Sequence, residues 1–73
     1  MTYNITKTYD SKPSKNCIES KGLTLEQAKQ ELIINDRLWS KHSGIVVSTT
    51  DNQLVVQEWD ESETITFTIT ESE

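Results

Sequence analysis

The stretch 45-IVVSTTDNQLVVQEWDESETITFTIT-70 decides the fold, because apolar and polar residues alternate through most of it. β-Branched residues dominate these runs, and such residues favour β-strands. Asp51-Asn52 suits a two-residue hairpin turn, since both residues tolerate a positive φ. Residues 60–63 are polar and suit a four-residue loop. The stretch therefore predicts a three-stranded antiparallel meander over 45–50, 53–59 and 64–70.

The two loop lengths also predict the register of this meander. A two-residue loop at 51–52 pairs Val47 with Val56, and a four-residue loop at 60–63 pairs Val56 with Phe67. Paired residues on neighbouring strands share a face. Both loops assign the same apolar face, which consists of Ile45, Val47, Leu54, Val56, Ile65, Phe67 and Ile69. The opposite, solvent-facing side consists of Val46, Ser48, Val55, Gln57, Trp59, Thr64, Thr66, Thr68 and Thr70.

Residues upstream of the meander predict a strand, a polar loop and a helix. Residues 2–9 alternate as a strand does, 10–16 are polar, and 17–20 are expected to form a short returning strand ended by Lys21-Gly22.

A helix is expected to begin after Thr24, which with Gln27 forms a Thr-x-x-Gln capping box. Its apolar stripe is Leu25, Ala28, Leu32 and, if the helix continues, Trp39. Asn35-Asp36 favour the end of the helix, and Ser43-Gly44 a turn.

These elements predict one small α+β domain spanning residues 1–73. We expect two layers: an N-terminal strand or hairpin, one helix, then the three-stranded antiparallel meander, in the order β(β)αβββ. The apolar stripe of the helix would cover the apolar face of the sheet. Tyr3 and Ile5 would contribute part of their side chains to the same core. The position of strand 2–9 in the sheet stays open.

Composition excludes several classes of protein. One Cys among 73 residues cannot form an internal disulfide, and one Cys with one His cannot complete a structural zinc site. The net charge of -5 argues against direct nucleic-acid binding, which depends on Lys and Arg. No apolar run reaches the length of a membrane span, and the first ten residues do not resemble a signal peptide. We therefore expect a cytoplasmic protein without membrane contact and without a cofactor.

The charge is unevenly distributed along the chain. Residues 1–42 carry seven basic and five acidic residues, whereas 43–73 carry seven acidic residues and no Lys or Arg. Such an acidic region is expected to bind a basic surface on a partner protein, because complementary potentials steer association. Trp59 would act as an aromatic anchor. The predicted partner-binding residues are Asp51, Glu58, Trp59, Asp60, Glu61 and Glu63.

Other readings of individual residues carry less weight. Glu58, Asp60, Glu61 and Glu63 could in principle bind Ca²⁺ or Mg²⁺, but their spacing differs from that of an EF-hand and a solvated loop is favoured. Cys17 and His42 lack any local signature of a catalytic pair, so no enzymatic activity is expected.

Two further functional classes stay open beside the acidic binding module. The first is a structural subunit that forms homodimers through the Thr-rich face or an open sheet edge. The second, which is less favoured, is a single-stranded nucleic-acid binder that uses Tyr3, Tyr9 and the N-terminal lysines.

The chain shows no motif that is diagnostic of a specific family. Its general plan of a polar strand, the helix start Gly22-Leu-Thr-Leu-Glu-Gln-Ala28 and an acidic Thr-rich meander resembles short open reading frames of bacteriophages and mobile elements. That resemblance implies an inhibitor or regulator that binds a host protein complex.

Overall fold

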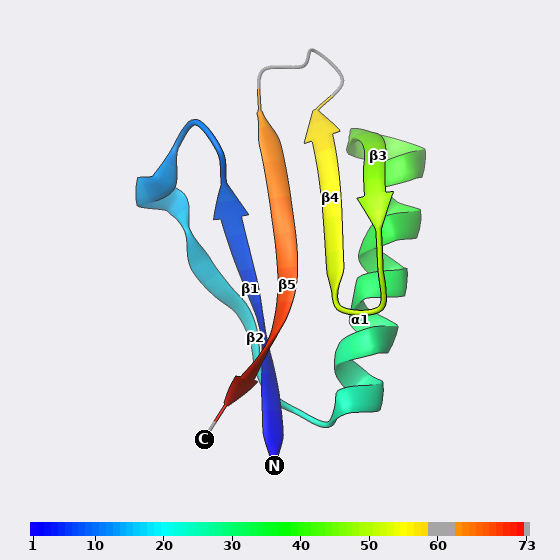
Figure 1. Ribbon diagram of the computed structural model, residues 1–73. Coiled ribbons are helices and arrows are strands. Elements are labelled where there is room, and N and C mark those ends of the chain that lie inside the picture. Colours follow the sequence, from blue (N-terminus) through cyan, green and yellow to red (C-terminus); the bar gives the residue numbers. More distant parts are fainter. Residues whose placement is uncertain (59–62, 73) are drawn as a thin grey trace.

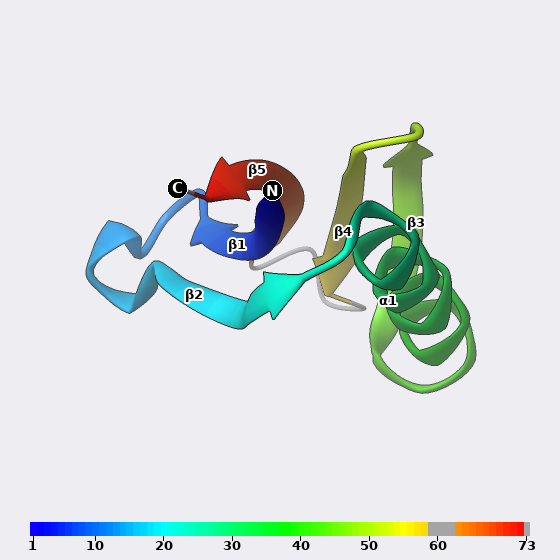
Figure 2. The same cartoon turned by 90° about the horizontal axis from the view of Figure 1, so that it is seen from below.

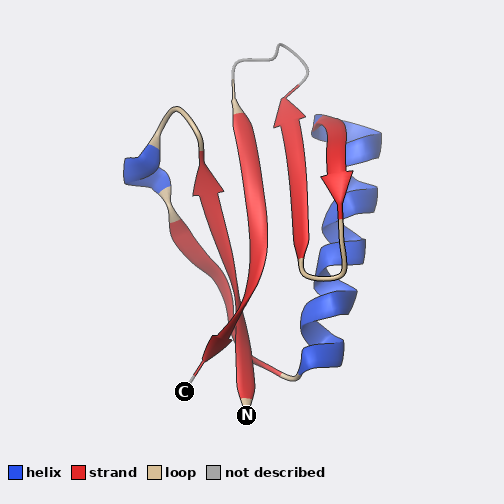
Figure 3. Ribbon diagram, viewed as in Figure 1, coloured by secondary structure: helices blue, strands red, loops and turns tan. Residues whose placement is uncertain are grey.

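The protein folds into one helix and a five-stranded antiparallel sheet (Figures 1 and 3). The computed structural model describes residues 1–58 and 63–72. The strand order in the sheet is β2-β1-β5-β4-β3. In chain order the elements are β1 (Thr2–Tyr9), the 3₁₀ turn η1 (Pro13–Lys15), β2 (Cys17–Leu23), α1 (Leu25–Leu38), the π-helical segment η2 (Trp39–Ser43), β3 (Gly44–Thr49), β4 (Gln53–Glu58) and β5 (Thr64–Ser72).

The small α+β domain expected from the sequence is confirmed in outline. The predicted three-stranded meander accounts for only three of the five strands, because β1 and β2 form a hairpin that extends the same sheet. β1 lies between β2 and β5 and pairs with β5 along its whole length, from Thr2–Ser72 to Tyr9–Ile65. β2 is longer than expected and continues through Gly22, whose φ of 66° is accommodated at an irregular position of the ladder.

The pairing of β4 with β5 differs from the predicted register by two residues. Val56 pairs with Ile65 instead of Phe67, and the ladder reaches the hydrogen bond from Glu58 N–H to the Glu63 carbonyl at 3.0 Å. A shift of two residues leaves every side chain on the face assigned to it. Leu54, Val56, Ile65, Phe67 and Ile69 are accordingly all buried.

The expected faces of β3 are wrong at its first residues. Thr49 pairs with Leu54, as the turn at 51–52 requires, but a bulge between Val46 and Ser48 then brings Val46 opposite Val56. One extra residue exchanges the two faces of a strand. Val46 therefore packs against the core, while Ile45 and Val47 are 44% and 57% exposed.

The helix begins where the capping box predicts. Gln27 N–H donates to Thr24 Oγ1 at 3.1 Å, and Thr24 N–H donates to Gln27 Oε1 at 2.9 Å. The expected end at Asn35-Asp36 is wrong, since α1 continues to Leu38 and passes directly into η2. Trp39 packs against the core, and burying an aromatic side chain outweighs the low helix propensity of two residues. The expected turn at Ser43-Gly44 is replaced by the end of η2 and the start of β3.

The helix covers one face of the curved, twisted sheet (Figure 2). Ala28 and Leu32 are its buried residues, and they meet the apolar face of the sheet. Among residues 1–58 and 63–72, no helix or second sheet covers the outer face of β1, β4 and β5. Within the part of the chain that the structure describes, no helix has the length and apolar character needed to cross a membrane. The core consists of Ile5, Ala28, Leu32, Leu54, Val56, Ile65, Phe67 and Ile69.

Candidate protein-binding surface

The predicted acidic residues lie at two separate ends of β4. Asp51 is exposed in the turn between β3 and β4, whereas Glu58 is half-buried at the far end of β4, where its N–H donates to the Glu63 carbonyl. Trp59, Asp60 and Glu61 fall outside the described residues. The structure therefore brings Glu58 and Glu63 together but separates Asp51 from both of them by the length of a strand.

The Glu63 side chain is hydrogen-bonded to the neighbouring 10–16 loop. Its side chain is only 5% exposed, and its carboxylate accepts hydrogen bonds from Ser11 N–H at 2.9 Å and Ser11 Oγ at 2.5 Å. These two hydrogen bonds lower the pKa of Glu63 below its ordinary 4.5, helped by the Thr64 backbone and by the charge of Lys12. The carboxylate is thus already engaged within the fold.

Basic residues from the N-terminal half lie near two of the acids, although none follows them in the sequence. Lys12 acts electrostatically on Glu63. Lys29 and Asp51 line the same hollow of about 140 Å³ between α1 and the β3–β4 turn, together with Leu32, Ile33, Thr49 and Thr50. The expected acidic surface is consequently mixed in charge on its helix side.

The sheet edge formed by β3 exposes apolar side chains. β3 is the last strand in the sheet order, and it contains no charged residue. Ile45 and Val47 project from it with 44% and 57% of their surface exposed. Sequence reasoning placed these two residues in the core and so missed this surface. The run Ile45-Val46-Val47 carried the signal, because three successive apolar residues in a strand cannot all face one core.

The outer face of β1, β4 and β5 is uncharged and, apart from Val55, polar, as the alternation predicted for these strands. Thr6 and Thr70 share a hydroxyl hydrogen bond at 3.3 Å, and Gln53 Nε2 donates to Thr68 Oγ1 at 3.4 Å. Along β1, β4 and β5 the residues that share this face are Thr2, Asn4, Thr6, Thr8, Gln53, Val55, Gln57, Thr64, Thr66, Thr68 and Thr70. We name this set the neutral face.

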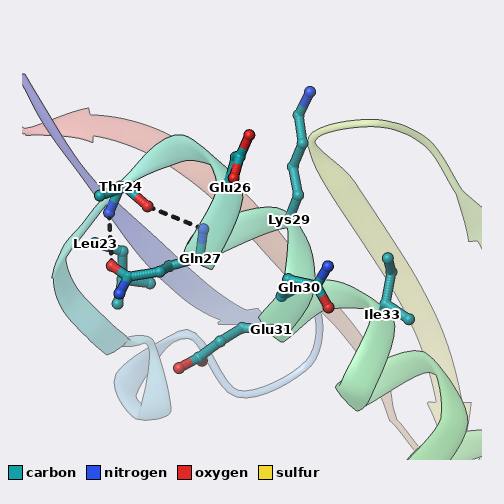
Figure 4. A pocket seen from close by; sticks show the side chains of 8 residues that line it. All are labelled: Leu23, Thr24, Glu26, Gln27, Lys29, Gln30, Glu31 and Ile33. Atoms are coloured by element: carbon teal, nitrogen blue, oxygen red, sulfur yellow. Dashed lines mark hydrogen bonds between the residues drawn. The ribbon is translucent and has the colours of Figure 1, made fainter.

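The outward side of α1 forms a shallow depression with charges of both signs (Figure 4). Glu26 and Lys29 both project from it, and Glu31 accepts a hydrogen bond from Ser20 Oγ at 2.7 Å. A mixed surface of this kind does not select for the charge of a partner. The depression is therefore no candidate for a partner selected by its charge.

Nothing in the described geometry assembles a catalytic or metal-binding group. Cys17 is exposed on β2, at one edge of the sheet, while His42 lies in η2, which leads into β3 at the other edge. Among residues 1–58 and 63–72, no group of three or more His, Cys, Asp or Glu residues could hold a metal ion.

The two tyrosines considered for base stacking lie on the side of β1 that faces the core. Tyr3 and Tyr9 are half-buried and pack against the core. The ammonium group of Lys7 lies 5.3 Å from the centre of the Tyr9 ring and 5.5 Å from that of Phe67. This contact occupies part of the ring surface on which a base would stack.

The chain matches no known protein family, and no similar curated protein or solved structure was found. Its function is therefore inferred from its own residues.

Proposed function

We propose that this protein is a small acidic, non-enzymatic protein-binding module whose partner presents a basic surface. The observation that supports this proposal is that the β3–β4 hairpin combines exposed apolar side chains with acidic residues. Its edge strand exposes Ile45 and Val47, and acidic residues stand at both ends, Asp51 in the turn and Glu58 at the end of β4. Apolar contacts surrounded by polar and charged groups are the usual anatomy of a protein interface.

The charge of this region supports a basic partner. Residues 43–73 contain seven acidic residues and no Lys or Arg, and the basic residues that the fold brings near them are Lys29, beside Asp51, and Lys12, near Glu63. A concentration of one sign of charge raises the rate of association with a surface of the opposite sign, and it disfavours acidic competitors.

The contact residues that we propose are Asp51, Glu58, Trp59, Asp60 and Glu61. We assign Glu63 to a different role, because its carboxylate is buried and holds Ser11. Its contribution to binding would then be indirect, through the position of the 10–16 loop.

We extend the proposal to an inhibitory or regulatory role, because an acidic surface can compete with a nucleic acid for a basic one. Proteins that handle nucleic acids present basic surfaces, because they must neutralise phosphate groups. An acidic module that covers such a surface would compete with the nucleic acid. The sign of the charge supports this part of the proposal.

The proposal is tested by reversing charge at each end of the hairpin separately. The variants are Asp51→Lys and the pair Asp60→Lys with Glu61→Lys, and the control is Glu19→Lys, an exposed acid on the opposite edge strand β2. Each tagged variant is used to capture partners from a lysate of the native host, at about 0.15 M and about 1 M salt. We expect both hairpin variants, but not the control, to lose the basic proteins that the wild type retains. Capture that is unchanged by both reversals at the lower salt would contradict the proposal.

Self-association is a second candidate, favoured by the neutral face. Its eleven residues include no charge, although 26% of the chain is charged. Hydroxyl and amide groups both donate and accept hydrogen bonds, so such a face is complementary to a copy of itself. Light scattering between about 10 μM and 1 mM would show a dimer if this face serves self-association, and a monomer throughout would exclude it.

A further inference from the structure

We propose that two copies of this chain form a dimer through the edge strand β3, so that their two five-stranded sheets join into one continuous sheet. The two β3 strands would run antiparallel about a two-fold axis perpendicular to the sheet. This inference goes beyond the proposed function and does not rest on it. It also uses a different surface from the neutral face.

The backbone of β3 has one side without a pairing strand. Among the strands that the structure describes, β3 is the last in the sheet order and pairs with β4 alone. A strand in that position presents N–H and C=O groups that a further strand can pair with. α1 lies on one face of the sheet, and η2 leads from it into the start of β3 (Figures 1 and 2).

The two edges of the sheet differ in how well they are protected. β2 shows the features that protect an edge strand: Glu19 and Lys21 are charged and exposed, its ladder with β1 shifts register twice, and Gly22 has a positive φ. β3 has a single bulge and no charged residue. β3 is therefore the edge at which strand pairing meets less opposition.

The charges at the two ends of β3 argue for a second copy as the occupant. Lys41 is exposed in η2, three residues before β3 begins at Gly44, and Asp51 is exposed in the turn, two residues after β3 ends at Thr49. If the two strands pair antiparallel along their whole length, Gly44 of one copy faces Thr49 of the other. Asp51 of each copy then comes alongside η2 of the other, which carries Lys41. Opposite charges at facing positions stabilise such a pair.

Other arrangements match these charges less well. A parallel pair would place Asp51 beside Asp51 of the second copy, and a segment with one sign of charge at both ends would meet a like charge at one of them. Glu58 does not alter this balance, because it lies on β4, one strand inside the edge, and is half-buried. Lys29 lines a hollow with Asp51, so it adds a positive charge at the turn end.

Exposed apolar side chains surround the same edge. Ile45, which pairs with Gln57 on the outer face of the sheet, is 44% exposed, and Val47 at the bulge is 57% exposed. Ile33 of α1 is 47% exposed and lines the hollow beside Thr49. A two-fold axis perpendicular to the sheet places both α1 helices on the same face. The dimer would therefore bring apolar side chains of both copies together, as the centre of an interface requires.

The first test measures the mass of the purified, intact protein by sedimentation equilibrium between about 10 μM and 1 mM, where we expect a monomer–dimer equilibrium. Val47→Lys should weaken the dimer at least about tenfold, because a charge on an edge strand opposes pairing. Two controls should leave it nearly unchanged: Ile18→Lys, at a 47% exposed residue of β2, and Thr70→Lys, on the neutral face. A monomer at all concentrations would overturn the proposal, as would a dimer that a control weakens and Val47→Lys does not.

The second test asks whether Asp51 of one copy meets Lys41 of the other. Asp51→Lys and Lys41→Asp each create a like-charge pair at both symmetric contacts of their own dimer, so each should weaken it at least about tenfold at about 0.15 M salt. In a one-to-one mixture of the two variants, the heterodimer restores opposite charges at both contacts. The mixture should therefore dimerise at least about tenfold more tightly than either variant alone.

Glu19→Lys and Lys21→Asp form the matched control pair, because both residues are exposed on β2 at the opposite edge. Their mixture should dimerise no more tightly than the tighter of the two single variants. An equal lack of preference in the mixture of Asp51→Lys with Lys41→Asp would overturn the antiparallel arrangement.

Amide hydrogen exchange tests whether the backbone takes part. In an antiparallel pair, alternate residues of a strand direct their N–H groups at the added strand. Alternate amides of residues 44–49 should exchange more slowly at about 1 mM than at about 10 μM, while the amides of β2 keep the same rates at both concentrations. Equal rates in β3 for a sample that is dimeric at the higher concentration would overturn strand pairing.

These experiments use the purified chain, so their outcome is separate from that of partner capture. Asp51 takes part in both, and a basic partner would compete with the second copy for this edge. If Asp51→Lys abolishes capture and the wild type is a monomer at every concentration, the proposed function stands and this inference falls. If the wild type dimerises as described and capture is unaffected by charge reversal, the reverse holds.

Discussion

Glu63 accepts two hydrogen bonds from Ser11, one from the backbone N–H at 2.9 Å and one from the hydroxyl at 2.5 Å. The two residues are 52 positions apart in the chain. Together with the bond from Asp10 N–H to the Thr64 carbonyl at 3.0 Å, they attach the 10–16 loop to the start of β5. Glu63, which the sequence predicted to bind a partner, is therefore hydrogen-bonded within the fold.

This pair makes stability depend on pH in the acidic range. The pKa of Glu63 is lower in the folded chain than its ordinary 4.5, so the unfolded chain takes up the proton first as pH falls. The stabilisation is complete above pH 4.5 and declines as pH falls through the lower, folded pKa. Urea unfolding at pH 7 and pH 3 should show that Glu63→Gln loses stability at pH 7 and varies less between the two pH values than the wild type.

Two comparisons control this experiment. Ser11→Ala removes the hydroxyl donor and should reproduce part of the effect of Glu63→Gln. Glu71→Gln changes an exposed carboxylate on the same strand and should leave both values nearly unchanged. An equal pH dependence in the wild type and Glu63→Gln would show that the hydrogen bonds to Ser11 do not stabilise the fold.

The two glycines should respond differently to substitution by alanine. A Cβ at Gly44 would overlap the backbone carbonyl oxygen of Gln57 in β4, so Gly44→Ala must displace a strand and should cost about 3 kcal/mol. At Gly22 the space is open, but the φ of 66° disfavours a side chain, for a cost of about 1 kcal/mol. Thermal unfolding measures both costs, and a larger loss at Gly22 than at Gly44 would contradict the assigned close contact.

The capping box should contribute measurably to the helix. Thr24→Ala removes the acceptor for Gln27 N–H and should cost about 1 kcal/mol. Thr24→Ser keeps the hydroxyl and is the matched control, with a cost close to zero. Urea unfolding measures both variants, and equal losses would mean that the methyl group of Thr24 matters more than its hydrogen bond.

The contact of Lys7 with two rings should stabilise the fold up to alkaline pH. Burial lowers the pKa of Lys7, but a hydrogen bond with Tyr9 and the charges of Tyr9, Glu19 and Cys17 together raise it above the ordinary 10.5. A raised pKa gives a stabilisation that is complete below pH 10.5 and is lost as pH rises through the folded value.

Lys7→Met keeps an apolar side chain of similar length and removes the charge. It should cost about 1 kcal/mol in urea unfolding at pH 7. Lys15→Met, at an exposed residue of η1, should cost almost nothing. Equal values for the two variants would show that the position of Lys7 over the rings of Tyr9 and Phe67 is not stabilising.

The candidate surface was only partly predictable. Asp51 was expected in a turn and is exposed there, because the turn depends on two adjacent residues. The exposure of Ile45 and Val47 was not expected, because the bulge in β3 depends on how β3 packs against β4 and η2. The positions of Lys12 near Glu63 and of Lys29 near Asp51 likewise depend on contacts between distant parts of the chain.

By itself, the sequence determined the features that depend on neighbouring residues: the start of α1 at the Thr24–Gln27 capping box, the turn at Asp51-Asn52, and the alternation that buries Leu54, Val56, Ile65, Phe67 and Ile69. Periodicity and capping are local, so they can be read along the chain. Only the tertiary structure decided that β1 lies beside β5, that β3 forms an open edge and that Glu63 binds Ser11. Each of these results from contacts between segments far apart in the chain, which no local pattern specifies.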